Sequence, residues 1–455
     1  MLVRKLRFAA ALMALACSTV VLAQATPDQL QAQVDALQKK VEALEAKQVS
    51  VADVNATVER VMADAQRRSE LMQPDGFTAG YNKGKFTMQS ADGAYSFSPT
   101  AQFQFRYEGT YREDAKHGAP GIGDSDSYDD GFELRRMKFG MAGNAVTTDL
   151  SYKFQWATDR ATGGVALEDA WLRYKLSDNW SLFGGQFEDL TSHESLVSSG
   201  KQLAVEQSYA NRVLLDNFSE YTQGFGGTYS TKALRLSGAL TDGANSDNTN
   251  YQDQPLAIAP TPASATALPT VYWGASARAE LMVLGDNWKQ YDDFSALNNK
   301  SDMLILGSGV SYSDADGGGL WLYSVDAQWE PEAVSGLALY AAVIGNQFDL
   351  NGASSYNNTG WVVQAGYMLN AKWEVFARYD EVNWDSTDFA EGADNNVQEC
   401  TVGVNYFISG HAAKFTADVV YLPNGTPRGE SGLGIMPEGD SKQEAVARLQ
   451  FQLLL

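Results

Sequence analysis

The stretch that decides the fold is Gln102-Phe103-Gln104-Phe105-Arg106-Tyr107-Glu108. Aromatic side chains alternate in it with amides and charged groups. Successive side chains of a β-strand point to opposite faces, so this stretch predicts a strand with one apolar and one polar face. The same alternation recurs at residues 151–156 and 272–281.

Sixteen stretches of this kind follow one another along the chain, and short and long connections alternate between them. The connections after the second, fourth, sixth and twelfth stretches are tight, and those after the first, fifth, seventh, thirteenth and fifteenth are long and polar. This double alternation is typical of a transmembrane β-barrel with tight periplasmic turns and long exterior loops. We therefore expect an all-β fold, a 16-stranded antiparallel barrel, whose even strand number places both of its ends in the periplasm. The expected strands are 99–112, 132–143, 148–158, 167–176, 180–187, 222–230, 233–242, 270–283, 303–313, 320–329, 337–346, 359–368, 373–383, 397–407, 413–422 and 444–453.

Two features bear on that count and on the competing folds. Residues 284–302 form a long segment where a tight turn is expected, so this is where an error in the number of strands would fall. A soluble β-sandwich or β-helix is the alternative fold. Aromatic residues at strand ends, such as Trp321 and Trp329, favour the barrel, because a bilayer interface collects such side chains.

The ends and the composition exclude several classes of function. Residues 1–25 have the basic start, apolar run and Ala23-Gln24-Ala25 site of a secretory signal peptide. Its removal takes the formal net charge from −22 to −25, which argues against a nucleic-acid partner. One cysteine, Cys400, and three histidines remain, too few for a usual zinc or thiol site. We expect no enzyme activity and no cofactor or metal.

Residues 26–75 predict a periplasmic α-helical coiled coil, and residues 76–455 form the expected barrel domain. The series Leu30, Val34, Leu37, Val41 and Leu44 has the spacing of a heptad seam. Valine at the a positions and leucine at the d positions of the heptad favour a coiled coil of two helices. The alternative is an amphipathic helix that rests on its own barrel.

Alternation also assigns the faces of the strands. If the apolar partners face lipid, a set of basic residues faces the lumen along one wall, while acidic residues such as Glu280, Asp326, Glu374, Asp380 and Asp418 lie opposite. A wall with one sign of charge concentrates the counter-ion, so the basic set predicts a path for anions. The alternative is that each basic residue pairs with an acid and serves structure, as Arg106 would with Glu108. The predicted anion path comprises Arg106, Arg112, Arg136, Lys138, Lys153, Arg173, Lys175 and Arg448.

Four segments resemble the phosphate-selective porin O and P family in order and spacing. They are Glu133-Leu134-Arg135-Arg136-Met137-Lys138-Phe139-Gly140, Leu150-Ser151-Tyr152-Lys153-Phe154, Leu167-Glu168-Asp169-Ala170-Trp171-Leu172-Arg173-Tyr174 and Gly184-Gly185-Gln186-Phe187-Glu188. The resemblance runs through residues 76–455. It implies a trimeric, sixteen-stranded channel with an arginine ladder, selective for phosphate or polyphosphate.

In porins a loop in the position of residues 189–221 folds inward and narrows the lumen. This connection offers His193, Lys201, Tyr209 and Arg212 as constriction candidates. The alternative is an ordinary exterior loop.

These observations support three hypotheses of function. The first is a passive anion-selective outer-membrane channel, with inorganic phosphate or another small anion as its solute. The second is a non-specific or cation-preferring porin, because the expected exterior loops are acidic. The third is a tether between outer membrane and cell wall, with an incidental pore. The expected partners are outer-membrane lipid, lipopolysaccharide and two further copies of the chain in a homotrimer.

Overall fold

The structure is a computed structural model in which two compact units divide the chain, Met1–Asp75 and Gly76–Leu455. In the first unit it describes residues 28, 31–32, 35–36, 38–40, 42 and 59–62, all helical. The expected signal peptide and most of the heptad seam lie outside the described residues, so the coiled coil stays a prediction. In the second unit the structure describes residues 76–82, 85–113, 128–160, 162–250, 254–255, 270–297, 299, 301–315, 318–350, 355–385, 395–426, 430–435 and 443–455.

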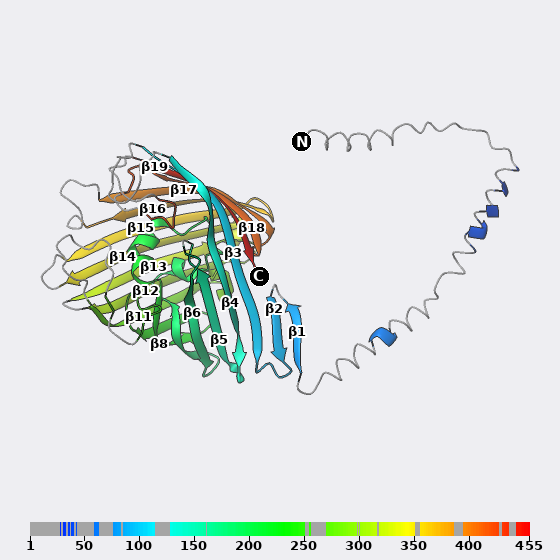
Figure 1. Ribbon diagram of the computed structural model, residues 1–455, viewed down its shortest axis with the longest axis horizontal. Helices are drawn as coiled ribbons and strands as arrows, with labels where there is room; N and C mark the ends of the chain where they lie inside the picture. The colour runs from blue at the N-terminus through cyan, green and yellow to red at the C-terminus, as the bar shows by residue number, and fades with distance from the viewer. Residues whose placement is uncertain are drawn as a thin grey trace. The chain divides into compact units, whose positions relative to one another are not determined.

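The second unit is a closed antiparallel barrel of sixteen strands (Figure 1). Each strand pairs with its neighbour along the chain, and the last strand closes on the first from Glu444 opposite Arg112 to Leu454 opposite Gln102. Every expected strand coincides with one observed strand, so the predicted strand number is confirmed. The barrel strands are β3 (Ser96–Arg112), β4 (Tyr128–Ala145), β5 (Thr147–Thr158), β6 (Val165–Lys175), β7 (Trp180–Glu188), β8 (Tyr221–Ser230), β9 (Leu234–Thr241), β11 (Thr270–Leu284), β12 (Met303–Ala315), β13 (Gly318–Glu330), β14 (Leu337–Leu350), β15 (Tyr356–Met368), β16 (Trp373–Asn383), β17 (Asn396–Ser409), β18 (Ala413–Leu422) and β19 (Glu444–Leu454).

Three short strands were not expected from the sequence. β1 (Phe77–Asn82) and β2 (Lys85–Ser90) form a hairpin that precedes the barrel. β2 pairs with β3 of the barrel through two residue pairs only. β10 (Gln254–Pro255) pairs with the start of β11. Among the described residues, no helix has the length and apolar character needed to span a membrane.

The long segment after β11 leaves the number of barrel strands at sixteen, because its described residues contain no strand. Its described residues form a short helix, α7 (Trp288–Tyr291), and then enter the lumen from the end of the barrel that carries the tight turns. Tyr291 and Phe294 are fully buried there. The Tyr291 hydroxyl donates to Asp326 of β13 at 2.9 Å, and the Ser295 hydroxyl donates to Glu374 of β16 at 2.7 Å. The segment therefore fills part of the lumen, and its length does not disturb the strand count. A one-turn 3-10 helix, η2 (Glu332–Val334), lies in the connection from β13 to β14.

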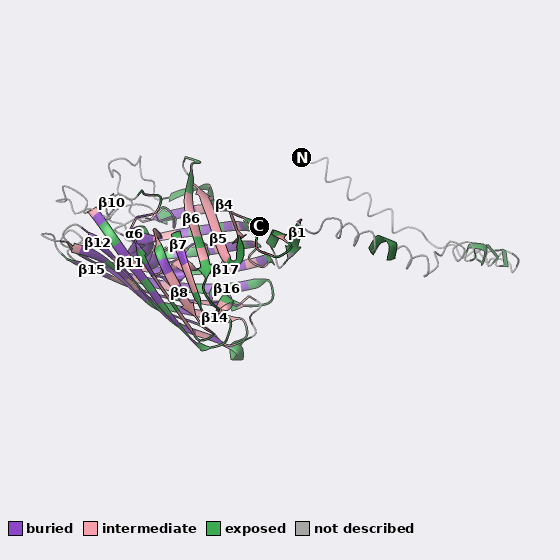
Figure 2. Ribbon diagram, turned by 90° about the horizontal axis from the view of Figure 1, so that it is seen from below, coloured by how far each residue is buried: buried purple, intermediate pink, exposed green. Residues whose placement is uncertain are grey.

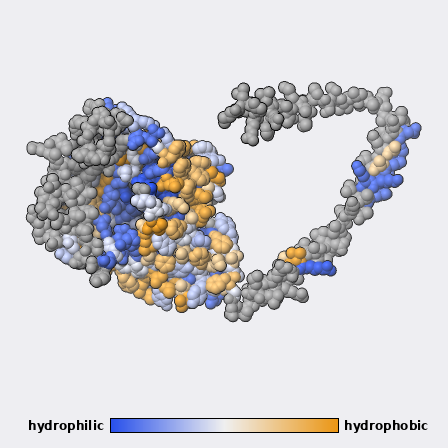
Figure 3. All heavy atoms as spheres, viewed as in Figure 1, coloured by the Kyte–Doolittle hydropathy of each residue, from blue (hydrophilic) through white to orange (hydrophobic). Residues whose placement is uncertain are grey.

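The outer surface of the strands is apolar, as expected for a wall that meets lipid. On β4, for example, Phe132, Leu134, Met137 and Phe139 are exposed, whereas the residues between them point inward. Figure 3 shows hydrophobic residues gathered over the barrel surface, with hydrophilic residues nearer the end that carries the long loops. An alternating pattern with an apolar outer face is what a bilayer requires of a spanning strand.

The strands differ in burial around the barrel: β4, β5 and β6 carry many residues of intermediate exposure, whereas β13, β15 and β16 alternate buried inward residues with more exposed ones (Figure 2). The connection between β7 and β8 folds inward and packs its apolar side chains on the inner faces of β13–β16. Leu203, Leu214 and Phe218 from the connection join Leu322 and Val362 of the wall in one buried cluster. By contrast, most inward residues of β4–β6 remain partly accessible. The connection contains α4 (His193–Leu196), α5 (Tyr209–Asn211), the π-helical turn η1 (Arg212–Asp216) and α6 (Asn217–Ser219).

Candidate functional site: a charged cavity in the lumen

We call β3–β7 the near wall of the barrel and β12–β19 the far wall. The connection between β7 and β8, the inward connection, lies against the far wall because its backbone groups bond to that wall. The amide of Ala210 donates to Asp380 at 3.0 Å, and the amide of Val205 donates to Asp418 at 2.9 Å. Asn405 donates to the carbonyl of Leu203 at 2.9 Å. Thus acids that the sequence places opposite the basic wall serve to hold the connection.

Glycines of the far wall provide the space for this close approach. A Cβ at Gly309 of β12 would lie 2.1 Å from the carbonyl oxygen of Thr191. A Cβ at Gly360 or Gly366 of β15 would lie 2.8 Å from Leu214 or Leu203, respectively. Any larger residue at Gly309 would therefore displace the start of the connection, since the atom it meets belongs to the backbone.

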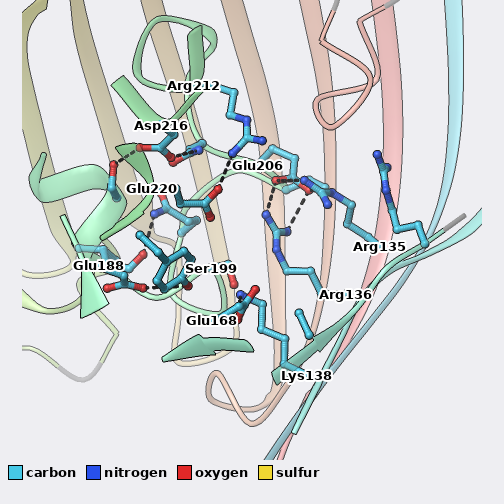
Figure 4. A pocket seen from close by; sticks show the side chains of 18 of the residues that line it. Arg135, Arg136, Lys138, Glu168, Glu188, Ser199, Glu206, Arg212, Asp216 and Glu220 are labelled. Carbon is cyan, nitrogen blue, oxygen red and sulfur yellow. Dashed lines mark hydrogen bonds and ion pairs between the residues drawn. The ribbon is translucent and has the colours of Figure 1, made fainter. Parts of the chain in front are cut away.

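Between the connection and the near wall lies a cavity of about 260 Å³ (Figure 4). Its charged lining comes from β4, β6, β7, the connection from β5 to β6 and the inward connection. The basic residues are Arg135, Arg136, Lys138, Arg160 and Arg212, and the acidic residues are Asp159, Glu168, Glu188, Glu206, Asp216 and Glu220.

At one side of the cavity three arginines share the carboxylate of Glu206. Arg135 Nε donates to Oε1 at 2.6 Å, and Arg106 Nη1 donates to the same oxygen at 3.0 Å. Arg136 binds both oxygens, with Nη1 at 3.0 Å from Oε1 and Nη2 at 2.7 Å from Oε2. Burial alone would raise the pKa of Glu206, but the three guanidinium groups outweigh burial and hold its pKa well below the ordinary value.

A β-bulge in β4 brings Arg135 into this cluster. Gln104 pairs with Arg136 and Phe105 pairs with Leu134, so Arg135 is the extra residue of the bulge. Both adjacent arginines therefore face the lumen. Strict alternation would place Arg135 towards lipid, at a cost of about 2–4 kcal/mol in the middle of a bilayer. That cost is the signal in the sequence from which the bulge could have been predicted.

Other basic residues of the predicted path pair with single acids of the same wall. Lys138 contacts Glu168 at 2.8 Å, and Lys153 contacts Asp169 at 2.7 Å. Lys175 pairs with Asp178 at 2.7 Å beside a tight turn, where both side chains are exposed. These three pairs have the form of the structural alternative, although Lys138 also lines the cavity.

Arg173 differs from these lysines because it makes no ion pair with a carboxylate of the described residues. Its guanidinium group lies over the rings of Trp171 and Phe183, 5.4 and 5.3 Å from their centroids. β6 runs towards a tight turn, so Arg173 lies nearer that end of the lumen than the cavity does.

Three members of the predicted path are buried. Arg106 is fully buried, and besides Glu206 it pairs with Glu108 at 2.9 Å and with Glu133. Arg448 binds Asp418 through two bonds of 2.7 and 2.8 Å. Arg112 is 3% exposed at the end of β3. None of the three lines the cavity.

Of the constriction candidates, only Arg212 lines the cavity, where it pairs with Glu220 at 2.8 Å. Lys201 donates to the carbonyl of Asp292, in the segment that enters from the other end. Tyr209 is fully buried, and its hydroxyl lies 2.8 Å from that of Thr426. His193 stacks on Tyr291 at 3.7 Å between ring centroids, and burial lowers its pKa to about 4.

The acids Glu188, Glu206, Asp216 and Glu220 were not predicted from the sequence. Asp216 accepts from Ser195 at 2.5 Å and from Gln207. Burial, followed by the nearby charge of Glu220, raises the pKa of Asp216 to about 7, against the opposing effect of Arg212. Its charge therefore changes near neutral pH.

Solved porins share this architecture. The anion-selective porin from Comamonas acidovorans is 10% identical with a TM-score of 0.55, over 79% of this chain and 100% of that one. OmpF of Salmonella typhi, in complex with daunomycin, is 12% identical with a TM-score of 0.51, over 79% and 98%. OprB of Pseudomonas putida is 10% identical with a TM-score of 0.50, over 78% and 94%. At these identities the likeness concerns the fold.

The barrel, its apolar outer face and its inward connection are those of an outer-membrane porin. The model of the family described as phosphate-selective porin O and P matches residues 105–453, so the chain belongs to that family. No curated protein sequence matches this chain.

Proposed function

We propose that this porin is a passive, anion-selective channel, with inorganic phosphate as its leading solute. The observation that carries the proposal is the unequal filling of the lumen. The inward connection covers acids of the far wall such as Asp380 and Asp418, while Arg135, Arg136 and Lys138 of the near wall border the cavity.

Guanidinium groups suit this role for two reasons. They stay charged at every physiological pH, and their planar fork matches an oxyanion. Their placement in a confined, low-dielectric passage focuses the field on a passing ion. Several sites of moderate strength, with Arg173 nearer the inner end, would let an anion enter and leave again.

The acids of the cavity support a second candidate, a non-specific or cation-preferring porin. Six acidic side chains line the cavity against five basic ones. Selectivity therefore depends on which charges are satisfied by partners, and not on the number of charges alone. Glu206 is satisfied by three arginines, whereas Asp216 is ionised only in part at neutral pH.

The deciding experiment is the reversal potential of the purified full-length protein in a planar bilayer under a KCl gradient, followed by titration with phosphate. We expect an anion-selective potential and a chloride current that phosphate reduces. Arg136→Ala should weaken both effects. A cation-selective potential would overturn the proposal in favour of the second candidate.

The remaining assignments belong to the same proposal. Residues 1–25 would be a signal peptide, residues 26–75 a periplasmic coiled coil, and the assembly a homotrimer in contact with outer-membrane lipid and lipopolysaccharide. The tether hypothesis depends on residues 26–75. Deletion of residues 26–74 should leave conductance intact in a porin and should damage envelope integrity if the segment is a tether.

A further inference from the structure

Among the described residues that line the cavity, only Glu206 is held to the far wall through its backbone and to the near wall through its side chain. Its backbone is fixed to the far wall, because its carbonyl accepts from Arg378 of β16 at 2.8 Å and the preceding amide bonds to Asp418. Its side chain crosses to the near wall and is 1% exposed among Arg106, Arg135 and Arg136 (Figure 4). The carboxylate of Glu206 therefore lies where a passing oxyanion would contact Arg135 and Arg136.

Arg135 and Arg136 depend on this one carboxylate. Among the described residues, neither forms an ion pair with any acid other than Glu206. Arg106 is different, because Glu108 and Glu133 remain beside it. Loss of the Glu206 charge would therefore leave two adjacent guanidinium groups without their ion-pair partner, and both of them border the cavity.

We propose that Glu206 is a tethered anion that occupies the Arg135–Arg136 site, so that it sets how tightly the channel holds an oxyanion such as phosphate. This inference rests on the proposed function and adds the residue that limits its affinity. A group joined to its site through the chain acts at an effective concentration of millimolar or more. Mobile phosphate must then compete with it, which keeps the site weak and allows rapid passage.

The test compares the wild-type protein with Glu206→Gln in planar bilayers, using inorganic phosphate to block chloride current. We expect half-block at a phosphate concentration at least roughly tenfold lower in the variant, because the tethered competitor is gone. Addition of Arg136→Ala to Glu206→Gln should abolish that gain. An unchanged half-block concentration in Glu206→Gln would overturn the inference.

Glu220→Gln is the matched control, since it removes one negative charge from the same cavity but from a partner of Arg212. If only the total charge of the cavity mattered, both variants would gain phosphate block equally, and the inference would fail. Should Glu206→Gln not yield a folded barrel, Glu206→Asp tests the same idea. It retains the charge but withdraws it from the arginines, so block should strengthen by a smaller factor.

The wild-type reversal potential separates this inference from the proposed function. An anion-selective wild type with no gain in Glu206→Gln contradicts the inference alone. A cation-selective wild type whose Glu206→Gln variant becomes phosphate-sensitive contradicts the proposed function and supports the inference.

Discussion

The near wall, β3–β7, and the far wall, β12–β19, have the same antiparallel architecture but different surroundings inside the lumen. Inward side chains of β4–β6 border an open cavity, whereas those of the far wall lie under the inward connection and the segment that carries α7. On the near wall a charge can act on a solute. On the far wall a charge of equal size holds a loop.

This difference shows why a lumen-facing charge is not by itself a selectivity residue. Arg136 and Arg448 both face inward, and each binds a carboxylate through two bonds. Arg136 borders the cavity and Arg448 is buried. Four predictions test the comparison, in order of the expected change in ion selectivity.

The largest change in ion selectivity is expected when the near wall loses Arg135 and Arg136. In Arg135→Ala/Arg136→Ala the carboxylate of Glu206 keeps only Arg106, so the cavity gains net negative charge. We expect the anion-to-cation permeability ratio to fall roughly tenfold, since field focusing in a narrow passage acts on local ion concentration. The measurement is the reversal potential under a KCl gradient. A ratio equal to that of the wild type would mean that the near wall does not select ions.

The second change removes the cover from the far wall. Gly309→Val places atoms against the carbonyl of Thr191, and overpacking of this kind costs about 1–3 kcal/mol. The start of the connection should move away from β12, which opens the lumen and exposes polar groups of the far wall. Single-channel conductance should rise and anion selectivity should fall. Gly238→Val is the control, because the nearest atom to a Cβ there is 3.8 Å away.

The strands of both walls were predictable, because the bilayer imposes one pattern on each of them. The filling of the lumen was not. A buried inward residue such as Val362 has the same alternation as a lipid-facing one, and only the packed connection explains its apolar character. The placement of Arg135 was missed because a bulge breaks the two-residue period on which the face assignment rests.

The third prediction concerns pH. Its residue, Asp216, belongs to the inward connection and lines the cavity. Asp216 has a raised pKa of about 7, so it is ionised at pH 8 and protonated at pH 6. A fall in pH across this range therefore removes a negative charge from the cavity. We expect the anion-to-cation permeability ratio to rise, by roughly twofold for the loss of one focusing charge. Asp216→Asn should abolish this pH step, and a step that persists in Asp216→Asn would assign it to another group.

The fourth prediction expects no change in selectivity. Arg448→Met removes a charge from the far wall, but Arg448 is buried under Leu433 and bound to Asp418, so no solute meets it. The permeability ratio should equal that of the wild type, although Arg448 belongs to the predicted anion path. Stability should fall by about 3–5 kcal/mol, because Asp418 becomes a buried charge without its partner.

The double variant Arg448→Met/Asp418→Asn separates the two roles of this pair. Removal of both charges should recover much of the stability, since no unpaired charge remains buried. Urea unfolding of the folded barrel in lipid vesicles provides the measurement, with the reversal potential taken on the same preparations. A shift in the permeability ratio of Arg448→Met as large as that of the near-wall variant would show that the field of the far wall reaches the solute through the connection. The two walls would then differ in how the inward connection packs on them, and not in whether their charges act on the solute.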